Sequence, residues 1–309
     1  MMSKKKKDDL YKQGYRLVGD HSAVKACMWT KKAIIGEGHC YKQKFYDTKT
    51  HLCVQMTPAL QTCTHRCLWC WRDIEFTKPK WAGKVDDPKL IVDGCIASNI
   101  KYLQGFGGNA KTDIKKYKEI NDPQQFAISL TGEPTMYPKL PELVLELRSR
   151  GINQFLVTNG TKPLMLKKLL DRKAQPTQLY ITLPAPDEKI YTKVCRPLIK
   201  NGWKNILKSL SLLSKFNRGV IRLTLVKGVN MIDAVGYASL IKKYKPRCVE
   251  CKAYMYVGYS QKRLKKENMP LHSEIKEFAL QIAKYSGYNI IDEKKESRVV
   301  LLGKSKVKY

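Results

Sequence analysis

Acidic residues and long apolar runs are both scarce in this chain of 309 residues, and each shortage excludes a class of protein. No apolar stretch approaches the roughly 18 residues that a membrane-spanning helix needs. The first residues, MMSKKKKDDLYKQ, are basic and lack the apolar core of a secretory signal. We therefore expect a cytoplasmic protein that does not use a membrane.

The scarcity of acid leaves a large positive charge. Asp and Glu total 27 against 58 Lys and Arg, which gives a formal net charge of +31. Thermal adaptation is the plainer explanation, but it enriches Glu together with Lys, and acidic residues are few here. A charge beyond what solubility requires favours a polyanionic partner, and we interpret it as a nucleic-acid-binding surface.

From His51 onward, short strand-like runs alternate with helical stretches. The runs are VQMTPAL, QFAISLTGE, INQFLVTNG, QLYITLPA, GVIRLTLVKG and VECKAYMYVG. Strands joined by helices of crossover length predict a parallel sheet, hence an α/β fold. About six such units predict an open or partial barrel, with the active site at the carboxyl ends of the strands.

The region before this alternation has a different character. Residues 1–50 are basic and irregular, and we expect short elements there rather than long helices. We divide the chain into an N-terminal extension, 1–50, and a barrel unit, 51–309, which closes with a helix and a β pair. The glycines and lysines of 104–119 predict a mobile loop.

Ten cysteines in a chain with no export signal are expected to be reduced thiols, so clustered ones are better interpreted as metal ligands than as disulfides. Six of them crowd into the first quarter of the chain: Cys27, Cys40, Cys53, Cys63, Cys67 and Cys70. The other four, Cys95, Cys195, Cys248 and Cys251, are scattered, and we expect them to be buried structural residues.

The run CTHRCLWCW directly follows the first predicted strand and carries Cys63, Cys67 and Cys70 as C-x3-C-x2-C. A cubic four-iron cluster takes four thiolates, so three leave one iron open for chemistry. The alternative is a zinc knuckle in which His65 supplies the fourth ligand.

The upstream cysteines form C-x12-C-x12-C, a spacing that is weak support by itself. Their position along the chain is stronger support for a metal site, because all three lie in the irregular segment that leads into the first strand. Cys27, Cys40 and Cys53 are therefore expected to fold over the barrel mouth as a second three-thiolate site with an open iron.

With the cysteine loop after the first strand, the sequence resembles the radical S-adenosylmethionine (SAM) superfamily. The resemblance implies a partial (β/α)6 barrel and a [4Fe-4S] cluster whose open iron binds SAM and yields a 5′-deoxyadenosyl radical. It also implies SAM-binding positions at the ends of the next strands. These are Gly132, Glu133 and Pro134, then Asn159, then Thr182.

Both cysteine sets together, with SLTGEPT, VTNGT, LVKG and YMYVGYS, resemble the tRNA-wyosine synthase family in its archaeal form. The resemblance implies a lyase with two [4Fe-4S] clusters. It would condense 1-methylguanosine at position 37 of tRNA-Phe with pyruvate, giving the tricyclic base 4-demethylwyosine in wybutosine biosynthesis. Eukaryotic relatives add a flavodoxin-like domain that this chain lacks, so we expect an external electron donor. We also expect a monomer, which is the simpler arrangement for a bulky RNA substrate.

Pyruvate needs a docking site. The open iron of the second cluster is a suitable Lewis acid for a 2-oxo acid. A lysine that forms a Schiff base is the alternative or the complement, and Lys42, two residues past Cys40, is the first candidate, followed by Lys44.

Two other functions remain open at this point. Another two-cluster radical SAM enzyme would act on RNA or a peptide, but such enzymes usually carry their extra cysteines after the barrel. A zinc-dependent RNA-binding module would explain the charge and the cysteines without catalysis. It would not explain the G-E-P turn or the β/α alternation.

Overall fold

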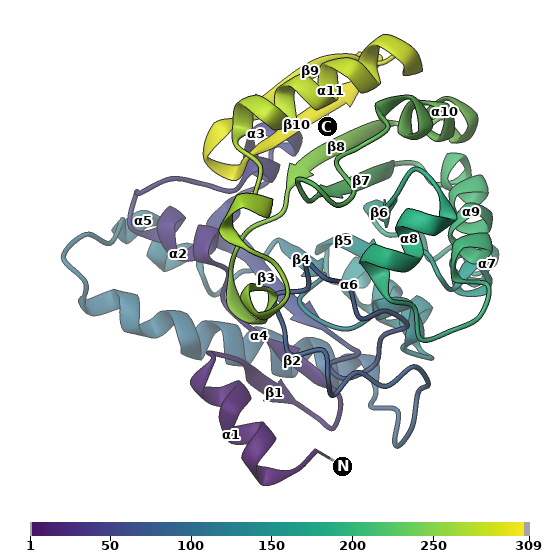
Figure 1. Cartoon of the computed structure of the whole chain (residues 1–309). Coiled ribbons are helices and arrows are strands. Elements are labelled where there is room, and N and C mark those ends of the chain that lie inside the picture. The colour runs from purple at the N-terminus through teal and green to yellow at the C-terminus, as the bar shows by residue number, and fades with distance from the viewer. Residues whose placement is uncertain (1, 306–309) are drawn as a thin grey trace.

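A computed structural model describes residues 2–305 and contains one curved, ten-stranded sheet (Figure 1). Its order is β1-β2-β3-β4-β5-β6-β7-β8-β10-β9. The six central strands, β3 to β8, are parallel. They span Cys53–Thr57, Gln125–Ile128, Asn153–Thr158, Gln178–Thr182, Gly219–Leu225 and Cys248–Ala253. These are the six strands predicted, and their arrangement is a partial (β/α)6 barrel.

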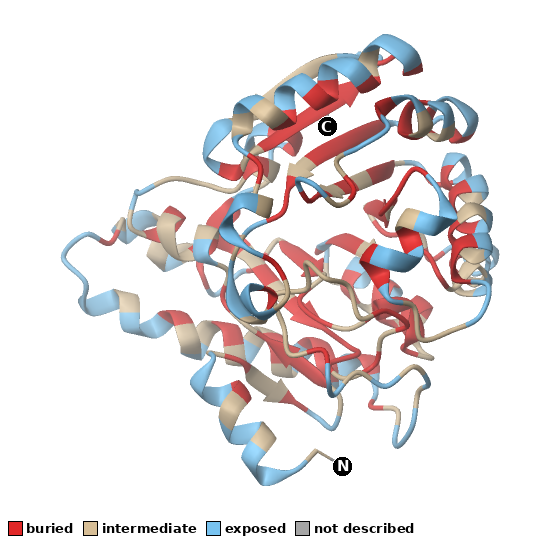
Figure 2. Ribbon diagram, in the orientation of Figure 1, coloured by how far each residue is buried: buried red, intermediate tan, exposed pale blue. Residues whose placement is uncertain are grey.

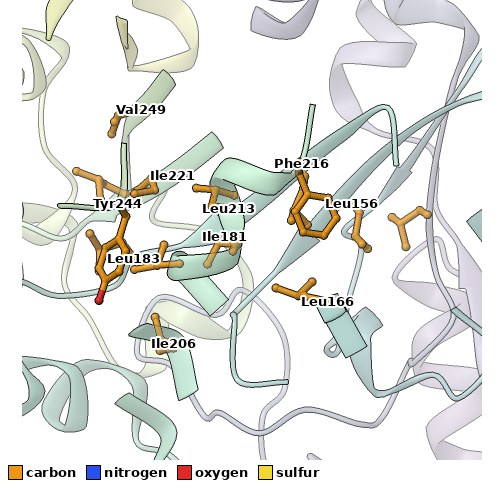
Figure 3. Packing of buried hydrophobic residues seen from close by; sticks show 14 of the residues in the cluster. Leu156, Leu166, Ile181, Leu183, Ile206, Leu213, Phe216, Ile221, Tyr244 and Val249 are labelled. Atoms are coloured by element: carbon orange, nitrogen blue, oxygen red, sulfur yellow. The ribbon is translucent and has the colours of Figure 1, made fainter. Parts of the chain in front are cut away.

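Helices cover the convex side of the sheet (Figure 1). They are α4 (Pro88–Leu103), α6 (Leu140–Ser149), α7 (Pro163–Asp171), α8 (Glu188–Cys195), α9 (Gly202–Leu212), α10 (Ala234–Tyr244) and α11 (His272–Ser286). Of these, α8 was not predicted. Their apolar faces meet the sheet in one large buried core, of which Figure 3 shows Leu156, Ile181 and Ile206. Figure 2 shows the exposed sides of the same helices facing solvent.

Local signals explain where these helices begin and end. Asp87 caps α4, with its side chain accepting a hydrogen bond from Lys89 N at 3.0 Å, and Pro88 occupies the first turn, where no backbone donor is needed. Helix α11 ends at Gly287, whose φ of +74° suits glycine. No helix in the described part of the chain is long and apolar enough to cross a membrane.

Two antiparallel pairs extend the parallel strands. Strands β1 (Arg16–Val18) and β2 (Ser22–Val24) continue the sheet beyond β3. At the other edge, β10 (Val299–Gly303) pairs with both β8 and β9 (Asn289–Lys294), which confirms the predicted β pair. The pair β1–β2 was not predicted, because its strands are only three residues long.

The N-terminal region contains the short helices α1 (Lys4–Lys12), α2 (Met28–Ile34) and α3 (Tyr41–Tyr46). Helix α3 lies against the concave side of the sheet. Its aromatic residues pack on the first halves of the strands, against Phe155, Tyr180, Val220, Cys248, Val299 and Leu301. Residues 1–50 are thus joined to the barrel by strand pairing and by packing, and the boundary at residue 50 stays a prediction.

The segment 104–119 is more regular than its composition predicted. It holds the 3-10 helix η2 (Gln104–Gly108) and the short helix α5 (Ile114–Glu119). Asp113 caps α5 by accepting a hydrogen bond from Lys116 N at 3.1 Å. The aromatic residues Phe106 and Tyr117 pack on the buried Ile34 cluster, so part of the segment is fixed to the N-terminal region.

Candidate active site

A cavity of about 380 Å³ opens at the carboxyl ends of the parallel strands, where the β/α alternation predicted the active site. The three loop cysteines form part of its wall. The strands and the turns that follow them contribute Gly132, Glu133, Asn159, Thr182, Arg222, Thr224 and Lys252. Its volume is within the range of small-molecule sites, about 300–1,000 Å³.

The cysteine loop is held by backbone contacts on both sides. Leu68 N donates to Val194 O at 2.9 Å, which ties the loop to α8. From the opposite side, Arg263 Nε donates to Leu68 O at 3.2 Å, and its guanidinium also contacts Cys70 O. The donors of Arg263 are thus used to fix this loop.

The loop thiols are partly exposed to the cavity and chemically suited to iron. Burial raises the pKa of Cys63, and a hydrogen bond with Cys195, followed by burial, raises the pKa of Cys67. Soft thiolate donors select iron–sulfur clusters over hard cations. Three thiols around one cavity therefore fit a cluster that takes one thiolate on each of three irons.

One tight group of ligand atoms includes only one thiol of this motif. Among the described residues, the ligand atoms of His65, Cys67 and Cys195 lie within 4.8 Å of one another. His65 Nε2 is also 2.9 Å from the Tyr191 hydroxyl. The predicted structural role of Cys195 is thus incomplete, because this buried thiol contacts the cluster loop directly.

The turn after β4 requires glycine at its centre. Gly132 has a φ of +66°, and a Cβ there would lie 1.7 Å from Ala59 O. No other residue fits without moving the backbone. The turn therefore packs closely on the segment that leads into the cysteine loop. In the same contact, Glu133 N donates a hydrogen bond to Thr62 O at 2.7 Å.

The Glu133 carboxylate organises the turn from within. One oxygen accepts hydrogen bonds from the hydroxyls of Thr135 and Thr158, each at 2.6 Å, and the other accepts from Asn159 N at 2.7 Å. These bonds join the ends of β4 and β5. Pro134 is buried and starts the 3-10 helix η3 (Pro134–Met136), behind the part of the turn that lines the cavity.

Asn159 connects the end of β5 to the cysteine loop. Its Nδ2 donates to Thr64 Oγ1 at 2.9 Å and lies 3.7 Å from Cys63 Sγ, while its Oδ1 accepts from Thr161 N at 3.0 Å. Thr182 ends β6 and also lines the cavity. The structure thus brings both predicted positions to the same wall as the loop thiols.

The upstream thiols lie at the starts of three elements. Cys27 precedes α2, Cys40 precedes α3, and Cys53 is the first residue of β3. Burial raises the pKa of Cys40 and raises the pKa of Cys53 to about 12. Each of these two thiols also lies within electrostatic range of Cys27. All six clustered thiols are partly exposed, whereas Cys95, Cys195, Cys248 and Cys251 are buried.

Lys42 points into this second thiol group from α3. Its Nζ lies 4.3 Å from the centre of the Phe155 ring and 5.2 Å from that of Tyr180. Burial lowers the pKa of Lys42, and the charge of Arg222 lowers it further. Lys44 has a different place: its Nζ pairs with Asp292 Oδ1 at 2.7 Å, and its side chain is 47% exposed.

The charged residues inside the barrel were not predicted from the sequence. Arg222 on β7 pairs with Glu250 on β8 at 2.8 Å, and Lys252 follows on the same face of β8. The available signal was a charge at alternate positions in two otherwise apolar strands, IRL and VECKA. Arg222 and Lys252 line the cavity and also lie within electrostatic range of Cys40 or Lys42, so they stand between the two thiol sets.

Comparison with known proteins agrees with this arrangement. The radical SAM superfamily model matches residues 58–241, and the model for wyosine base formation matches residues 243–304. The fold, the cysteine loop and these matches define a radical SAM enzyme. SAM and one [4Fe-4S] cluster are the cofactors of this superfamily, and the soft thiols beside the cavity fit such a cluster.

Individual relatives identify the family within the radical SAM superfamily. A tRNA 4-demethylwyosine synthase of Pyrococcus abyssi is 48% identical over 294 residues, or 94% of this chain and 86% of that one. A structure of TYW1 with a lysine–pyruvate adduct bound superposes with a TM-score of 0.88 at 36% identity, covering 98% of this chain and 97% of that one. The crystal structure of archaeal TYW1 superposes with a TM-score of 0.80 at 33% sequence identity, with the same coverage of both chains. This chain belongs to the S-adenosyl-L-methionine-dependent tRNA 4-demethylwyosine synthase family.

Proposed function

We propose that this enzyme condenses 1-methylguanosine at position 37 of tRNA-Phe with pyruvate to form 4-demethylwyosine, using two [4Fe-4S] clusters. One observation carries the proposal. The cavity that contains the C-x3-C-x2-C thiols ends at Arg222 and Lys252, which lie beside the second thiol set and Lys42. A radical source and a site for a second substrate would then share one space.

The first cluster would be held by Cys63, Cys67 and Cys70. The bound cluster and SAM would supply the 5′-deoxyadenosyl radical, which is the cofactor's own chemistry. The turn at Gly132 to Pro134 would receive the ammonium group of SAM through its backbone oxygens, since the Glu133 carboxylate already accepts hydrogen bonds from neighbouring residues. Asn159 and Thr182 would line the nucleoside part.

The second cluster would be held by Cys27 and Cys40 in the N-terminal extension, 1–50, and by Cys53 at the start of β3 in the barrel unit, 51–309. Soft thiolates at three separate chain positions fit the donor set of a cluster with an open iron. The related TYW1 structure with a lysine–pyruvate adduct supports a covalent role for a lysine. Lys42 is the lysine we assign, because it lies among these thiols and Lys44 does not.

The step at Lys42 is Schiff-base formation. The neutral amine attacks the ketone carbon of pyruvate, a C=N bond replaces the C=O bond, and the ketone oxygen leaves as water with the two amine protons. The aromatic rings of Phe155 and Tyr180 beside Nζ exclude bulk water and would slow hydrolysis of the product.

The nucleic acid partner is supported by the charge of +31 and by the names of the relatives. A methylated base beside the anticodon would have to leave its stack to reach a cavity at the strand ends, as base-modifying enzymes require. We further propose that the chain works in the cytoplasm, where reduced thiols persist, as a monomer that receives electrons from an external donor.

The test of the covalent step is reductive trapping. Anaerobically reconstituted protein is incubated with pyruvate and cyanoborohydride, and the modified peptide is identified by mass spectrometry. We expect the adduct on Lys42, its loss in Lys42→Met, and its retention in Lys44→Met, the control from the same helix. Trapping on another lysine, or full product formation by Lys42→Met with 1-methylguanosine tRNA, would refute the assignment.

A further inference from the structure

Three cationic side chains surround one carboxylate between the two thiol sets. Arg222 and Glu250 are register partners on β7 and β8, and Lys252 is the next inward residue along β8. Lys42 reaches the same region from α3, since the charges of Arg222 and Glu250 both act on it. The mechanism proposed above uses only Lys42.

Arg222 is already paired. Its guanidinium donates from Nε to Glu250 Oε2 at 2.9 Å and from a second nitrogen to the Tyr41 hydroxyl at 2.7 Å. The hydroxyls of Tyr41 and Tyr46 donate to the two oxygens of Glu250 at 3.1 and 2.8 Å. Glu250 is fully buried, so this network fixes the Arg222 charge and largely offsets it.

Lys252 has no such partner. Its Nζ donates to the backbone oxygen of Ser297 at 3.3 Å and lies 4.9 Å from the centre of the Tyr41 ring. Among the residues from 2 to 305, none places a carboxylate within 4.0 Å of this ammonium group. Burial lowers its pKa and the charge of Arg222 adds to that effect, while Cys40, Glu250 and Cys27 act in the opposite direction.

A partly buried ammonium group that lines a cavity and has no carboxylate within 4.0 Å is suited to bind an anion. Lys252 lies over the ring of Tyr41, the residue directly before Lys42, and within electrostatic range of Cys40. A 2-oxo acid carries its carboxylate on the atom next to its ketone. One lysine that attacks the ketone and a second that pairs with the carboxylate therefore match the two functional groups of such a substrate.

We propose that Lys252 binds the carboxylate of the 2-oxo acid whose ketone reacts with Lys42, and so selects a 2-oxo acid over a neutral ketone. The inference rests on the proposed function, because it takes the Schiff base at Lys42 as its starting point. Arg222, held by Glu250, supports the same region as a positioning residue through its bond to Tyr41.

Two other roles for Lys252 lead to different results. If it only balances the charge of the upstream thiolates, its removal changes iron binding and leaves pyruvate affinity alone. If it is itself the reactive amine, the trapped adduct lies on Lys252. A carboxylate held only by the open iron would also leave pyruvate affinity unchanged when Lys252 is replaced.

The experiment measures the concentration of ketone that half-saturates trapping at Lys42 in the anaerobically reconstituted enzyme. Pyruvate is compared with methyl pyruvate, in which the carboxylate is masked as an ester. The variants are Lys252→Met, which keeps an unbranched side chain without the charge, Lys252→Arg, which keeps the charge, and Lys44→Met as a surface control. Iron content and the cluster absorbance are recorded for each.

For Lys252→Met we expect the half-saturating pyruvate concentration to rise about 10- to 100-fold, the loss expected for one charge-assisted hydrogen bond. Methyl pyruvate should give the same value with wild type and Lys252→Met, which also shows that the variant is folded and that Lys42 still reacts. Lys252→Arg should restore most of the preference for pyruvate.

An unchanged pyruvate value in Lys252→Met, with Lys42 still trapped, overturns the inference and leaves the proposed function intact. The inference is also overturned if Lys252→Met raises the half-saturating concentrations of pyruvate and methyl pyruvate by the same factor. No adduct on Lys42 in wild type overturns the proposed function itself, and an adduct on Lys252 overturns both assignments.

Discussion

The two thiol sets of this enzyme are built in opposite ways. Cys63, Cys67 and Cys70 lie in one loop, and their pattern is complete within the run CTHRCLWCW. Cys27, Cys40 and Cys53 stand at the starts of α2, α3 and β3, and only the folded chain brings them together. The first set depends on the conformation of one loop, and the second set depends on the relative positions of α2, α3 and β3.

This difference separates what stabilises each set. The loop is fixed by backbone contacts with α8 and by Arg263. The upstream set depends on α3, whose Tyr41 and Tyr46 bond to Glu250 inside the barrel. Substitutions at these two kinds of support should therefore affect one set and spare the other.

The largest effect is expected from Cys67→Ala. Iron should fall from about eight to about four per chain, and SAM cleavage should fall to background, because the first cluster loses a ligand. Iron analysis and deoxyadenosine assay measure both. Cys95→Ala, which removes a thiol buried on α4 outside both thiol sets, is the matched control and should retain cleavage. If Cys67→Ala cleaves SAM normally, the loop is not the radical site.

Cys40→Ala should lose a similar amount of iron with a different consequence. Deoxyadenosine should still form, while 4-demethylwyosine in tRNA falls to background, because the loop cluster is intact and the second substrate site is not. Chromatography of digested tRNA measures the product. Full product formation would show that the upstream set is dispensable, and zinc in place of iron in the wild type would end the two-cluster proposal.

Glu250→Gln tests the support of α3. It leaves the Arg222 charge buried without a counter-ion, so we expect the free energy of unfolding to fall by about 3–5 kcal/mol. Urea denaturation of the metal-free protein measures this. In the reconstituted enzyme, iron should be lost from the upstream set first. Glu142→Gln, which removes an exposed ion pair with Arg172, should change stability by less than about 1 kcal/mol. Equal effects would contradict the assigned role of Glu250.

Tyr46→Phe should have the smallest effect. It removes one hydrogen bond, 2.8 Å long, to a buried carboxylate oxygen, and we expect a loss of about 1–2 kcal/mol, with both clusters still assembled at low temperature. Tyr285→Phe, at a side chain that is exposed at the surface, is the control and should be neutral. A drop in SAM cleavage for Tyr46→Phe would show that the two sets are coupled.

The sequence predicted the parts of the fold that local patterns specify. All six parallel strands were predicted, since each is a short apolar run bounded by turns, and the loop thiols followed from their spacing. The pair β1–β2 and the helix α8 were missed, because their patterns are too short to be distinguished from loops.

The site was predicted less completely, for a physical reason. Long-range contacts such as Arg222–Glu250, or Cys67 beside Cys195, depend on the register of strands and on loop packing, which one sequence does not reveal. The assignments of Lys42, Asn159 and Thr182 stay predictions.

Helix α3 also determines how the enzyme can be shortened. Its rings cover Phe155, Tyr180 and Val220 on the concave side of the sheet. A chain that began at residue 51 would expose this aromatic surface and leave Glu250 and Arg222 open to water. Such a fragment is expected to aggregate rather than to persist as a simpler radical enzyme. Engineering of a minimal catalyst would therefore have to supply a substitute for this helix before any cofactor is considered.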